Sequence, residues 1–367
     1  ATKGARREQL FYHIIVIISV LQSTLSRIFG HSGCELRGTG CEVICDVFTP
    51  HLVTRTPQHK TQSMLINNLK IAWRHLVKDK WISLINFAGL VVGMTAVLFI
   101  WQYVAFEKGY DKLHENGDRV YRVRTDRLKD GVPFMQFAGG AACAGPVIAN
   151  NFPEVENYVK LVQSGDAIYY TQKEVTFEPE KVYYAMPSLF EIFDFELAHG
   201  DPKNCLNEPF QACISESTAK KLFGEEDPMG KTIKRNNNTE YTVTGITKDS
   251  PINSHLKFDI LLSYITYSDV FFDGGATETA PYWDGYLTYL LLKSNTDPVA
   301  LESKIPNVMR ETYDEDAAKN VVFYLQPFED IHLYSNFLFE TETPGDGNAV
   351  NFLLIIGSLV LLIAWFN

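Results

Sequence analysis

Residues 82–106 read ISLINFAGLVVGMTAVLFIWQYVAF, a run of 25 residues that contains no charged side chain. At about 1.5 Å of rise per residue, a helix of this length crosses a hydrocarbon layer of about 30 Å with some tilt. Trp81, Trp101 and Tyr103 lie near its ends, where aromatic side chains favour the membrane surface. The run therefore predicts a membrane-spanning helix over residues 81–106.

A second uncharged run stands at the other end of the chain. Residues 349–366 read AVNFLLIIGSLVLLIAWF, and Asn367 is the last residue. The length is again enough for a span. We expect residues 349–367 to form a second transmembrane helix that the sequence truncates.

The charge is distributed unevenly around the first span. Residues 1–106 carry 11 lysines and arginines against 5 acidic residues, whereas residues 107–348 carry 22 against 39. The acidic segment argues against a nucleic acid partner and against a domain lying flat on an anionic bilayer. Before the span stand Lys70, Arg74, Lys78 and Lys80 against Asp79, which favours a cytoplasmic N-side and places residues 107–348 outside. The asymmetry is slight, since Lys108, Lys112 and Arg119 follow the span closely.

Two segments precede the first span. Residues 64–80, MLINNLKIAWRHLVKDK, have apolar residues at helical spacing and a polar face with Lys70, Arg74 and Lys78. We expect an amphipathic helix at the cytoplasmic interface, and a plain helical lead-in is the alternative. Residues 1–63 show no such pattern, and Met64 opens the coherent sequence. We expect residues 1–63 to be a non-native or unstructured upstream segment, with a genuine N-terminal extension as the alternative.

The central segment, residues 107–348, alternates short strand patterns with a few helices. Residues 215–223 predict a helix capped by Ser215 and ended by Gly224. Residues 298–312 predict a second helix, and residues 232–247 predict a hairpin that turns at 236–238. The other strand patterns are residues 120–125, 167–171, 181–185, 241–246, 286–292 and 321–325. The segment therefore predicts an α+β domain.

Patterns that carry chemistry are scarce. Residues 224–232, GEEDPMGKT, resemble a phosphate-binding loop, but five residues separate the glycines where the loop needs four. The stretch also leads into a strand, so Lys231 is interpreted as a solvated turn residue. The nine histidines lack metalloprotease spacing. Cys143, Cys205 and Cys213 give the outer domain an odd count, which leaves room for one disulfide outside the cell. We expect no catalytic, cofactor or metal site on this chain.

Gly89 and Gly93 form a G-x-x-x-G pattern within the first span. Small residues four apart let a second helix approach closely. The alternative is that glycine is simply common in membrane helices. We predict a helix-packing role for both residues, against a span of this chain or of a partner.

Four stretches in one order resemble a known family. They are INFAGLVVGMTAVLFIWQYVAFEKGYDKLHENGDRVYRV (85–123), SESTAKKLFGEEDPMGKTI (215–233), YTVTGITKDSPINSHLKFDILLS (241–263) and LQPFEDIHLYS (325–335). From Met64 onward the sequence resembles the FtsX-like permeases of the MacB family of ABC transporters, especially the long versions found in Bacteroidota. The outer segment is similar to the family's MacB-like periplasmic core domain, which has two lobes.

The resemblance implies a function that composition does not show. Permeases of this family pair as homodimers or heterodimers in the bacterial inner membrane and bind cytoplasmic ATPase subunits, which hold ATP and magnesium. Some arrangements add a periplasmic adaptor. The permease is not an enzyme: it transmits ATP-driven motion across the bilayer for export or extraction of peptides, antibiotics or lipoproteins. On this resemblance Lys70, Arg74 and Lys78 belong to the cytoplasmic coupling surface, Gly89 and Gly93 belong to the moving span, and the chain is the N-terminal part of a multi-pass permease.

Two other classes of protein compete with this interpretation. A membrane-anchored extracytoplasmic sensor or binding module would need a cytoplasmic signalling domain. An extracytoplasmic enzyme would need a cleft with converging titratable residues, and the sequence shows no such cluster.

Overall fold

The computed structural model describes residues 77–366 except 172, 174, 237–238, 273–278, 282–283 and 313–318, together with residues 67, 70, 71, 73 and 74. The predicted upstream segment, residues 1–63, lies outside this range. The chain divides into two compact units. The sheet unit is Gln102–Leu354, and the helix unit contains the described residues up to Trp101 and those from Ile355 on.

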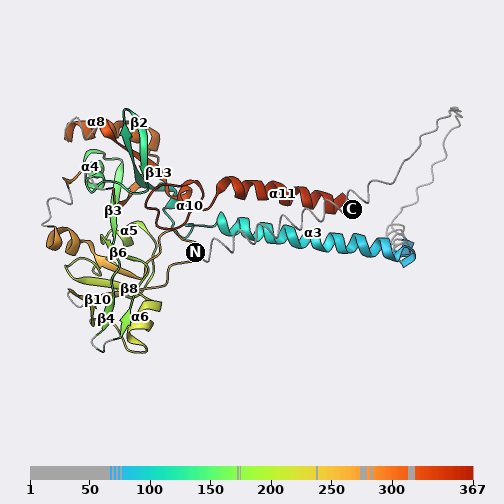
Figure 1. The fold of residues 1–367 in the computed structure, drawn as a ribbon, viewed down its shortest axis with the longest axis horizontal. Coiled ribbons are helices and arrows are strands. Elements are labelled where there is room, and N and C mark those ends of the chain that lie inside the picture. The colour runs from blue at the N-terminus through green and yellow to red at the C-terminus, as the bar shows by residue number, and fades with distance from the viewer. Residues whose placement is uncertain are drawn as a thin grey trace, which may run out of the picture. The chain divides into compact units, whose positions relative to one another are not determined.

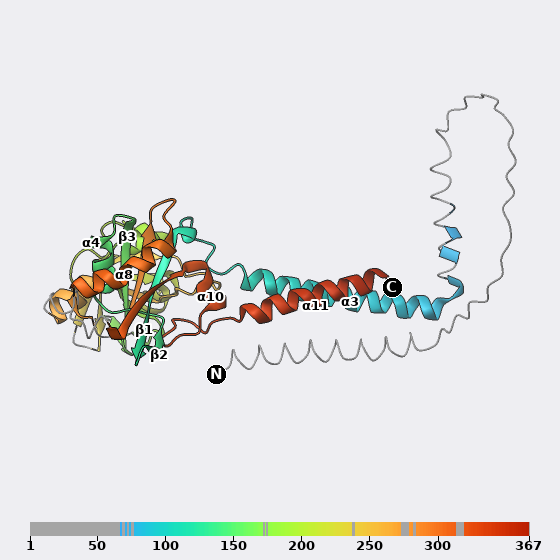
Figure 2. The same cartoon turned by 90° about the horizontal axis from the view of Figure 1, so that it is seen from above.

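The helix unit is built from two apolar helices, α3 (Lys80–Glu107) and α11 (Gly347–Phe366). Mean hydropathy reaches 2.1 in α3 and 2.5 in α11, so both are long and apolar enough to cross a membrane by length and composition. They contain the two predicted spans. α11 lies alongside α3 in both views (Figures 1 and 2), and Gly93 of α3 faces Val360 and Ala364 of α11.

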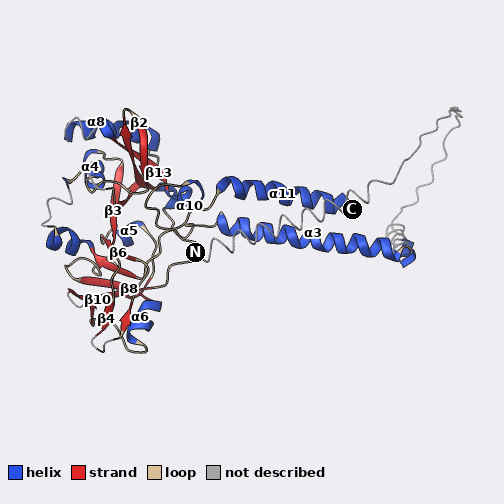
Figure 3. Cartoon of the chain, viewed as in Figure 1, coloured by secondary structure: helices blue, strands red, loops and turns tan. Residues whose placement is uncertain are grey.

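The sheet unit contains one sheet, which has 13 strands among the described residues. Its path runs β13-β1-β12-β3-β6-β11-β8-β10-β9-β4-β5, while β2 pairs with β1 and β7 with β10. Figure 3 colours the strands red and the helices blue. The pairing is antiparallel except for β8 with β10 and β6 with β11. The strands are β1 (Val120–Lys129), β2 (Val132–Phe137), β3 (Val155–Gln163), β4 (Tyr169–Thr171), β5 (Thr176–Phe177), β6 (Val182–Ala185), β7 (Leu197–Gly200), β8 (Gln211–Ser215), β9 (Thr232–Arg235), β10 (Thr239–Thr247), β11 (Ile260–Ser263), β12 (Tyr286–Leu292) and β13 (Val321–Pro327).

Helices cover the sheet and complete its cores. Ile148 of α4 (Ala144–Asn151) and Ile305 of α8 (Pro298–Thr312) share a buried cluster with Val123, Leu290 and Phe323 of three neighbouring strands (Figure 2). The remaining short helices are η1 (Gly117–Arg119), α5 (Leu189–Ile192), α6 (Glu216–Phe223), η2 (Thr266–Phe271), η3 (Phe328–Asp330) and α10 (Ile331–Tyr334). The predicted α+β fold class is confirmed.

The local signals around α6 act as predicted. The Ser215 side chain accepts a hydrogen bond from the Thr218 backbone N–H at 3.2 Å, and Gly224 ends the helix at φ 64°. Lys231 follows in a turn, where its Nζ lies 2.8 Å from Glu226, and the chain then enters β9. A phosphate-binding loop would open a helix here, so the interpretation of Lys231 as a turn residue is confirmed.

Candidate functional site

The segment 107–116, here called the entry segment, connects the end of α3 to η1 within the sheet unit. Three of its titratable residues, Glu107, Asp111 and His114, are buried. Burying ionisable groups is costly unless each finds a partner. In this protein each one contacts a residue far away in the sequence, so the entry segment is fixed by polar contacts as well as by packing.

Glu107 is the last residue of α3 and pairs with His332 of α10. The Glu107 carboxylate lies 2.7 Å from His332 Nε2, and both side chains are about 2% exposed or less. The Tyr110 ring stacks on the imidazole with 3.4 Å between centroids. Gly345 closes the site, because a Cβ at this position would stand 2.8 Å from Glu107 Oε2 and 3.0 Å from His332 Nε2. The geometry leaves no room for a side chain above the pair.

Asp111 is held by the segment that precedes β11. Its carboxylate accepts hydrogen bonds from Ser254 Oγ at 3.0 Å, from the His255 backbone N–H at 2.9 Å and from His255 Nδ1 at 2.8 Å. Burial raises the pKa of Asp111, but the contacts with His255 and Ser254 outweigh burial and leave this pKa below its usual value. His255 Nε2 lies 3.0 Å from the Tyr289 hydroxyl, so a neutral imidazole that donates to Asp111 accepts from Tyr289.

His114 lies in an aromatic cage formed by Phe193, Phe195 and Phe328. Its Nδ1 accepts a hydrogen bond from the Asp194 backbone N–H at 3.0 Å, which places the imidazole proton on Nε2. Burial lowers the pKa of His114 to about 4, although the charges of Asp111 and Asp194 oppose the shift. His114 is therefore a neutral core residue at neutral pH.

The segment 335–346, here called the strap, leads from α10 to α11 and is tied to the sheet by charge. Arg122 on β1 is fully buried and bridges both carboxylate oxygens of Glu340, at 2.7 and 2.9 Å. The same guanidinium donates to Gln326 at 2.7 Å and to Ser335 at 2.8 Å. A bidentate pair of this kind is strong and directional. It fixes the strap at a defined position on the sheet.

The strap ends in a helix cap. The Asp346 side chain accepts hydrogen bonds from the backbone N–H groups of Asn348 at 2.9 Å and Ala349 at 3.1 Å. An aspartate at this position accepts hydrogen bonds from backbone N–H groups that the helix itself leaves unpaired. Its negative charge also interacts favourably with the positive end of the helix dipole. The start of α11 is thus capped by the strap, and the last residue of α3, Glu107, is held by His332.

Together these contacts form a joint, which we define by Glu107, Asp111, His332, Arg122 and Glu340. The last turn of α3 and the first turns of α11 both belong to the sheet unit. Across the described residues no group of three or more His, Cys, Asp or Glu side chains is arranged to hold a metal ion. The joint consists of paired groups, an arrangement suited to holding two helix ends rather than to acid–base chemistry.

The residues predicted for helix packing differ in their surroundings. Gly93 is buried, and a Cβ there would stand 3.7 Å from both Val360 and Ala364. On α11, a Cβ added to Gly357 would likewise stand 3.3 Å from the Ile100 side chain of α3. Gly89 is half-buried. The structure thus brings Gly93 to a second span of the same chain, and the functional role of both glycines stays a prediction.

The residues predicted for cytoplasmic coupling lie before α3. Lys70, Arg74 and Lys78 are helical and exposed, as are Ile71 and Trp73. Much of the predicted apolar face, including Leu65, Leu69 and Leu76, lies outside the described residues. The coupling role of the three basic residues stays a prediction.

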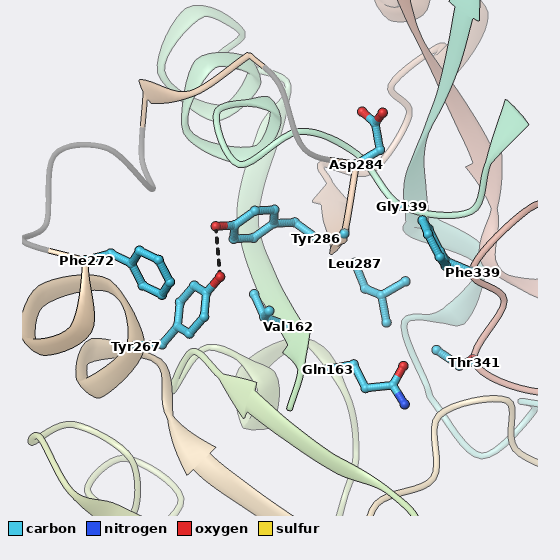
Figure 4. Close-up of a pocket in the computed structure, with 11 residues that line it drawn as sticks. Gly139, Val162, Gln163, Tyr267, Phe272, Asp284, Tyr286, Leu287, Phe339 and Thr341 are labelled. Carbon is cyan, nitrogen blue, oxygen red and sulfur yellow. Dashed lines mark hydrogen bonds between the residues drawn. The ribbon is translucent and has the colours of Figure 1, made fainter. Parts of the chain in front are cut away.

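A pocket of about 330 Å³ lies elsewhere in the sheet unit (Figure 4). Its walls are largely apolar, and Figure 4 shows Tyr267 and Tyr286 facing each other with hydroxyls 3.4 Å apart. Asp284 on its wall accepts two hydrogen bonds from the Arg127 guanidinium, at 2.7 and 2.9 Å. The pocket thus combines largely apolar walls with two polar pairs.

The family model for the MacB-like periplasmic core domain matches residues 83–308. The chain belongs to the MacB-like permease family. This MacB-like permease carries the general role of a transporter permease component, which is not itself an enzyme, and membership implies an ABC transporter with an ATPase partner. The periplasmic core domain and the two apolar helices make it a membrane protein with a periplasmic domain. The resemblance seen in the four sequence stretches is confirmed at the level of the family.

Three solved structures are similar to parts of this chain. A domain assigned to a permease protein from Porphyromonas gingivalis matches with 23% identity and a TM-score of 0.50, covering 58% of this chain and 92% of that one. Two further matches are the periplasmic region of MacB from Actinobacillus actinomycetemcomitans (13% identity, TM-score 0.41, 59% and 91% covered) and the extracellular domain of the noncanonic ABC-type transporter YknZ from Gram-positive bacteria (12%, 0.38, 56% and 99%). No curated protein matches this MacB-like permease in sequence.

The joint was not predicted from the sequence of this MacB-like permease. One signal was present: Glu107, Asp111 and His114 follow a span at i, i+4 and i+7, the spacing that aligns residues on one side of a helical path. Their partners stand as far as 225 residues away, for the pair of Glu107 with His332. No local pattern links residues at that separation.

Proposed function

We propose that this chain is the permease subunit of a MacB-type ABC transporter of the bacterial inner membrane. In this proposal it is one part of a multi-pass permease pair, and ATP and magnesium are held by a separate cytoplasmic ATPase. Conformational change driven by ATP moves the spans, and the spans move the periplasmic domain. The work serves export or extraction of a substrate such as a peptide, an antibiotic or a lipoprotein.

The observation that supports this proposal best is the joint. Transmission of motion requires that the ends of the spans be fixed to the domain they move, because a flexible linker would absorb the displacement. In this chain Glu107 ties the end of α3 to α10, and the strap ties the start of α11 to β1 through Arg122 and Glu340. Two rigid attachments can transmit both a translation and a rotation of the spans to the periplasmic domain.

The test asks whether the outer domain responds to nucleotide. The full-length permease is purified from its native membrane with its associated proteins. We expect an ABC ATPase to copurify, and distances between spin labels on exposed residues of the two permease copies to change when a non-hydrolysable ATP analogue is added. Absence of an ABC ATPase, or outer-domain distances that ignore nucleotide, would reject the proposal.

The same preparation distinguishes a permease from the competing interpretation, a membrane-anchored sensor. A membrane-anchored sensor would copurify a signalling partner and respond to an outer ligand without added nucleotide. A nucleotide response without such a ligand therefore favours the permease.

A further inference from the structure

Two of the three described cysteines meet in one part of the core. Cys213 lies in the middle of β8, and Cys205 lies in the connection between β7 and β8. Both are buried, at 0% and 1% exposure, and both belong to the same hydrophobic cluster. Cys143 lies in a different cluster beside α4. The three cysteines of the outer domain are therefore one neighbouring pair and one separate thiol.

Gly245 of β10 provides the space in which the pair meets. It stands opposite Cys213 in the parallel ladder of β8 and β10, beside a register shift. A Cβ on Gly245 would lie 2.8 Å from Cys213 Sγ and 3.1 Å from Cys205 Cβ. The two cysteine side chains thus occupy the volume that a residue at position 245 would otherwise fill. The Cys213 sulfur and the Cys205 Cβ therefore border the same position in the core, and a disulfide requires neighbouring side chains of this kind.

The thiols also interact directly. A hydrogen bond between the two side chains and burial raise the pKa of the Cys213 thiol well above its usual value. A thiol of this kind is a poor nucleophile once the domain has folded. Oxidation would therefore take place during folding, before β8 is buried, and the finished bond would be shielded from reductants.

We propose that Cys205 and Cys213 form a disulfide in the mature outer domain. In the reaction two S–H bonds break, one S–S bond forms and two protons leave. The two electrons pass to a disulfide of a thiol oxidoreductase, which is reduced to its dithiol. The bond closes a short loop and ties the β7–β8 connection to β8. The proposal rests on the periplasmic location, because a disulfide persists only in an oxidising compartment.

Trypsin makes the test direct, because both cysteines fall in one peptide. Cleavage after Lys203 and Lys220 releases residues 204–220, NCLNEPFQACISESTAK, whereas Cys143 is released separately in residues 130–160. Cells that express the full chain are quenched in acid, and the protein is denatured, alkylated and digested. We expect peptide 204–220 without alkyl groups and two hydrogens lighter than its reduced form, and peptide 130–160 fully alkylated. Reduction before alkylation should add two alkyl groups to peptide 204–220.

Cysteine variants test the disulfide separately from the periplasmic location that it requires. In a Cys205→Ser chain, Cys213 should become fully alkylated. In a Cys205→Ser and Cys213→Ser chain that also carries Glu225→Cys, an exposed position, a membrane-impermeant maleimide added to spheroplasts should label residue 225. Labelling at 225 together with two alkyl groups on the wild-type peptide would overturn the disulfide and leave the location intact. Failure to label 225 in intact spheroplasts, with labelling after lysis, would overturn the location and the proposed function with it.

Discussion

Gly345 sets the clearest constraint at the scale of single residues. A Cβ there would approach Glu107 Oε2 to 2.8 Å and Leu333 Cδ2 to 3.0 Å, so an added methyl must displace the buried pair. We expect Gly345→Ala to lower the free energy of unfolding of the outer domain by about 1–3 kcal/mol through overpacking. Chemical denaturation followed by circular dichroism measures the change.

Gly165 provides the matched control for this substitution. A Cβ at Gly165 meets nothing within 4 Å, so Gly165→Ala should leave the free energy of unfolding unchanged within about 0.5 kcal/mol. Equal effects of the two substitutions would show that the space above Glu107 and His332 is not tight.

His114 predicts a pH dependence of stability. Its pKa is about 4 in the folded protein and about 6.5 when exposed, so between these values the unfolded chain binds more protons. Stability therefore falls as the pH is lowered from 6.5 towards 4, by at most about 3 kcal/mol from this residue. The melting midpoint measured across this range should decline steeply in the wild type.

Replacing His114 isolates its share of that decline. His114→Phe keeps the aromatic contacts with Phe193 and Phe328 but cannot take up a proton. We expect a lower midpoint at pH 7, from the lost hydrogen bond with the Asp194 backbone, and a flatter slope between pH 6.5 and 4. An unchanged slope would show that other groups cause the decline.

At the scale of elements, the strap has a buried ion pair among its contacts with the sheet. Glu340→Ala would leave the fully buried Arg122 without its bidentate partner. Such an uncompensated charge costs about 3–5 kcal/mol, and we expect a loss of that size in the free energy of unfolding. The exposed pair of Lys248 with Glu196 is the control, and Glu196→Ala should not change the midpoint. Similar losses for the two variants would contradict a special role for the strap.

The two apolar helices depend on a close approach at Gly93. Ordinary contact with Val360 and Ala364 leaves space for a methyl group but not for a larger side chain. Gly93→Leu should separate α3 from α11 and reduce the yield of folded protein in detergent or bilayers, because van der Waals packing drives helix association in lipid. Met94→Leu is the control, since Met94 is exposed on the next position of α3. Unimpaired assembly of the Gly93→Leu chain would reject the packing role.

Elements with mixed polarity or clear end signals were predictable from the sequence. β1, β10 and β12 follow strand patterns, and α6 begins and ends at its cap residues. The strands β8 and β11 were missed because QACIS and ILLS are short runs buried along nearly their whole length, which carry no alternation. β2 was also missed. Its residues are mostly exposed, and it pairs with β1 to one side of the main strand path.

The joint could not be predicted from the sequence for a different reason. Its members are ordinary polar residues until the sheet brings β1, α10 and the strap together. Arg122 and Glu340 are 218 positions apart, and nothing in either neighbourhood indicates burial. Long-range pairing is a property of the fold, and only the order of the strands reveals it.

At the scale of the whole molecule, we predict that disrupting the joint uncouples ATP hydrolysis from movement of the outer domain. Glu107→Ala with His332→Ala removes both members of the first attachment and leaves no buried charge unpaired at that position. In the proposed transporter the ATPase partner would contact the cytoplasmic side, so we expect ATP hydrolysis to continue. The nucleotide-dependent change in outer-domain distances should shrink or vanish, because α3 would no longer hold α10. The control is Arg119→Ala with Glu156→Ala, which removes a half-exposed pair at 2.9 Å in the same domain. Loss of hydrolysis and movement together in the first variant would mean that the joint supports assembly, whereas full movement in that variant would mean that force enters the domain through the strap alone.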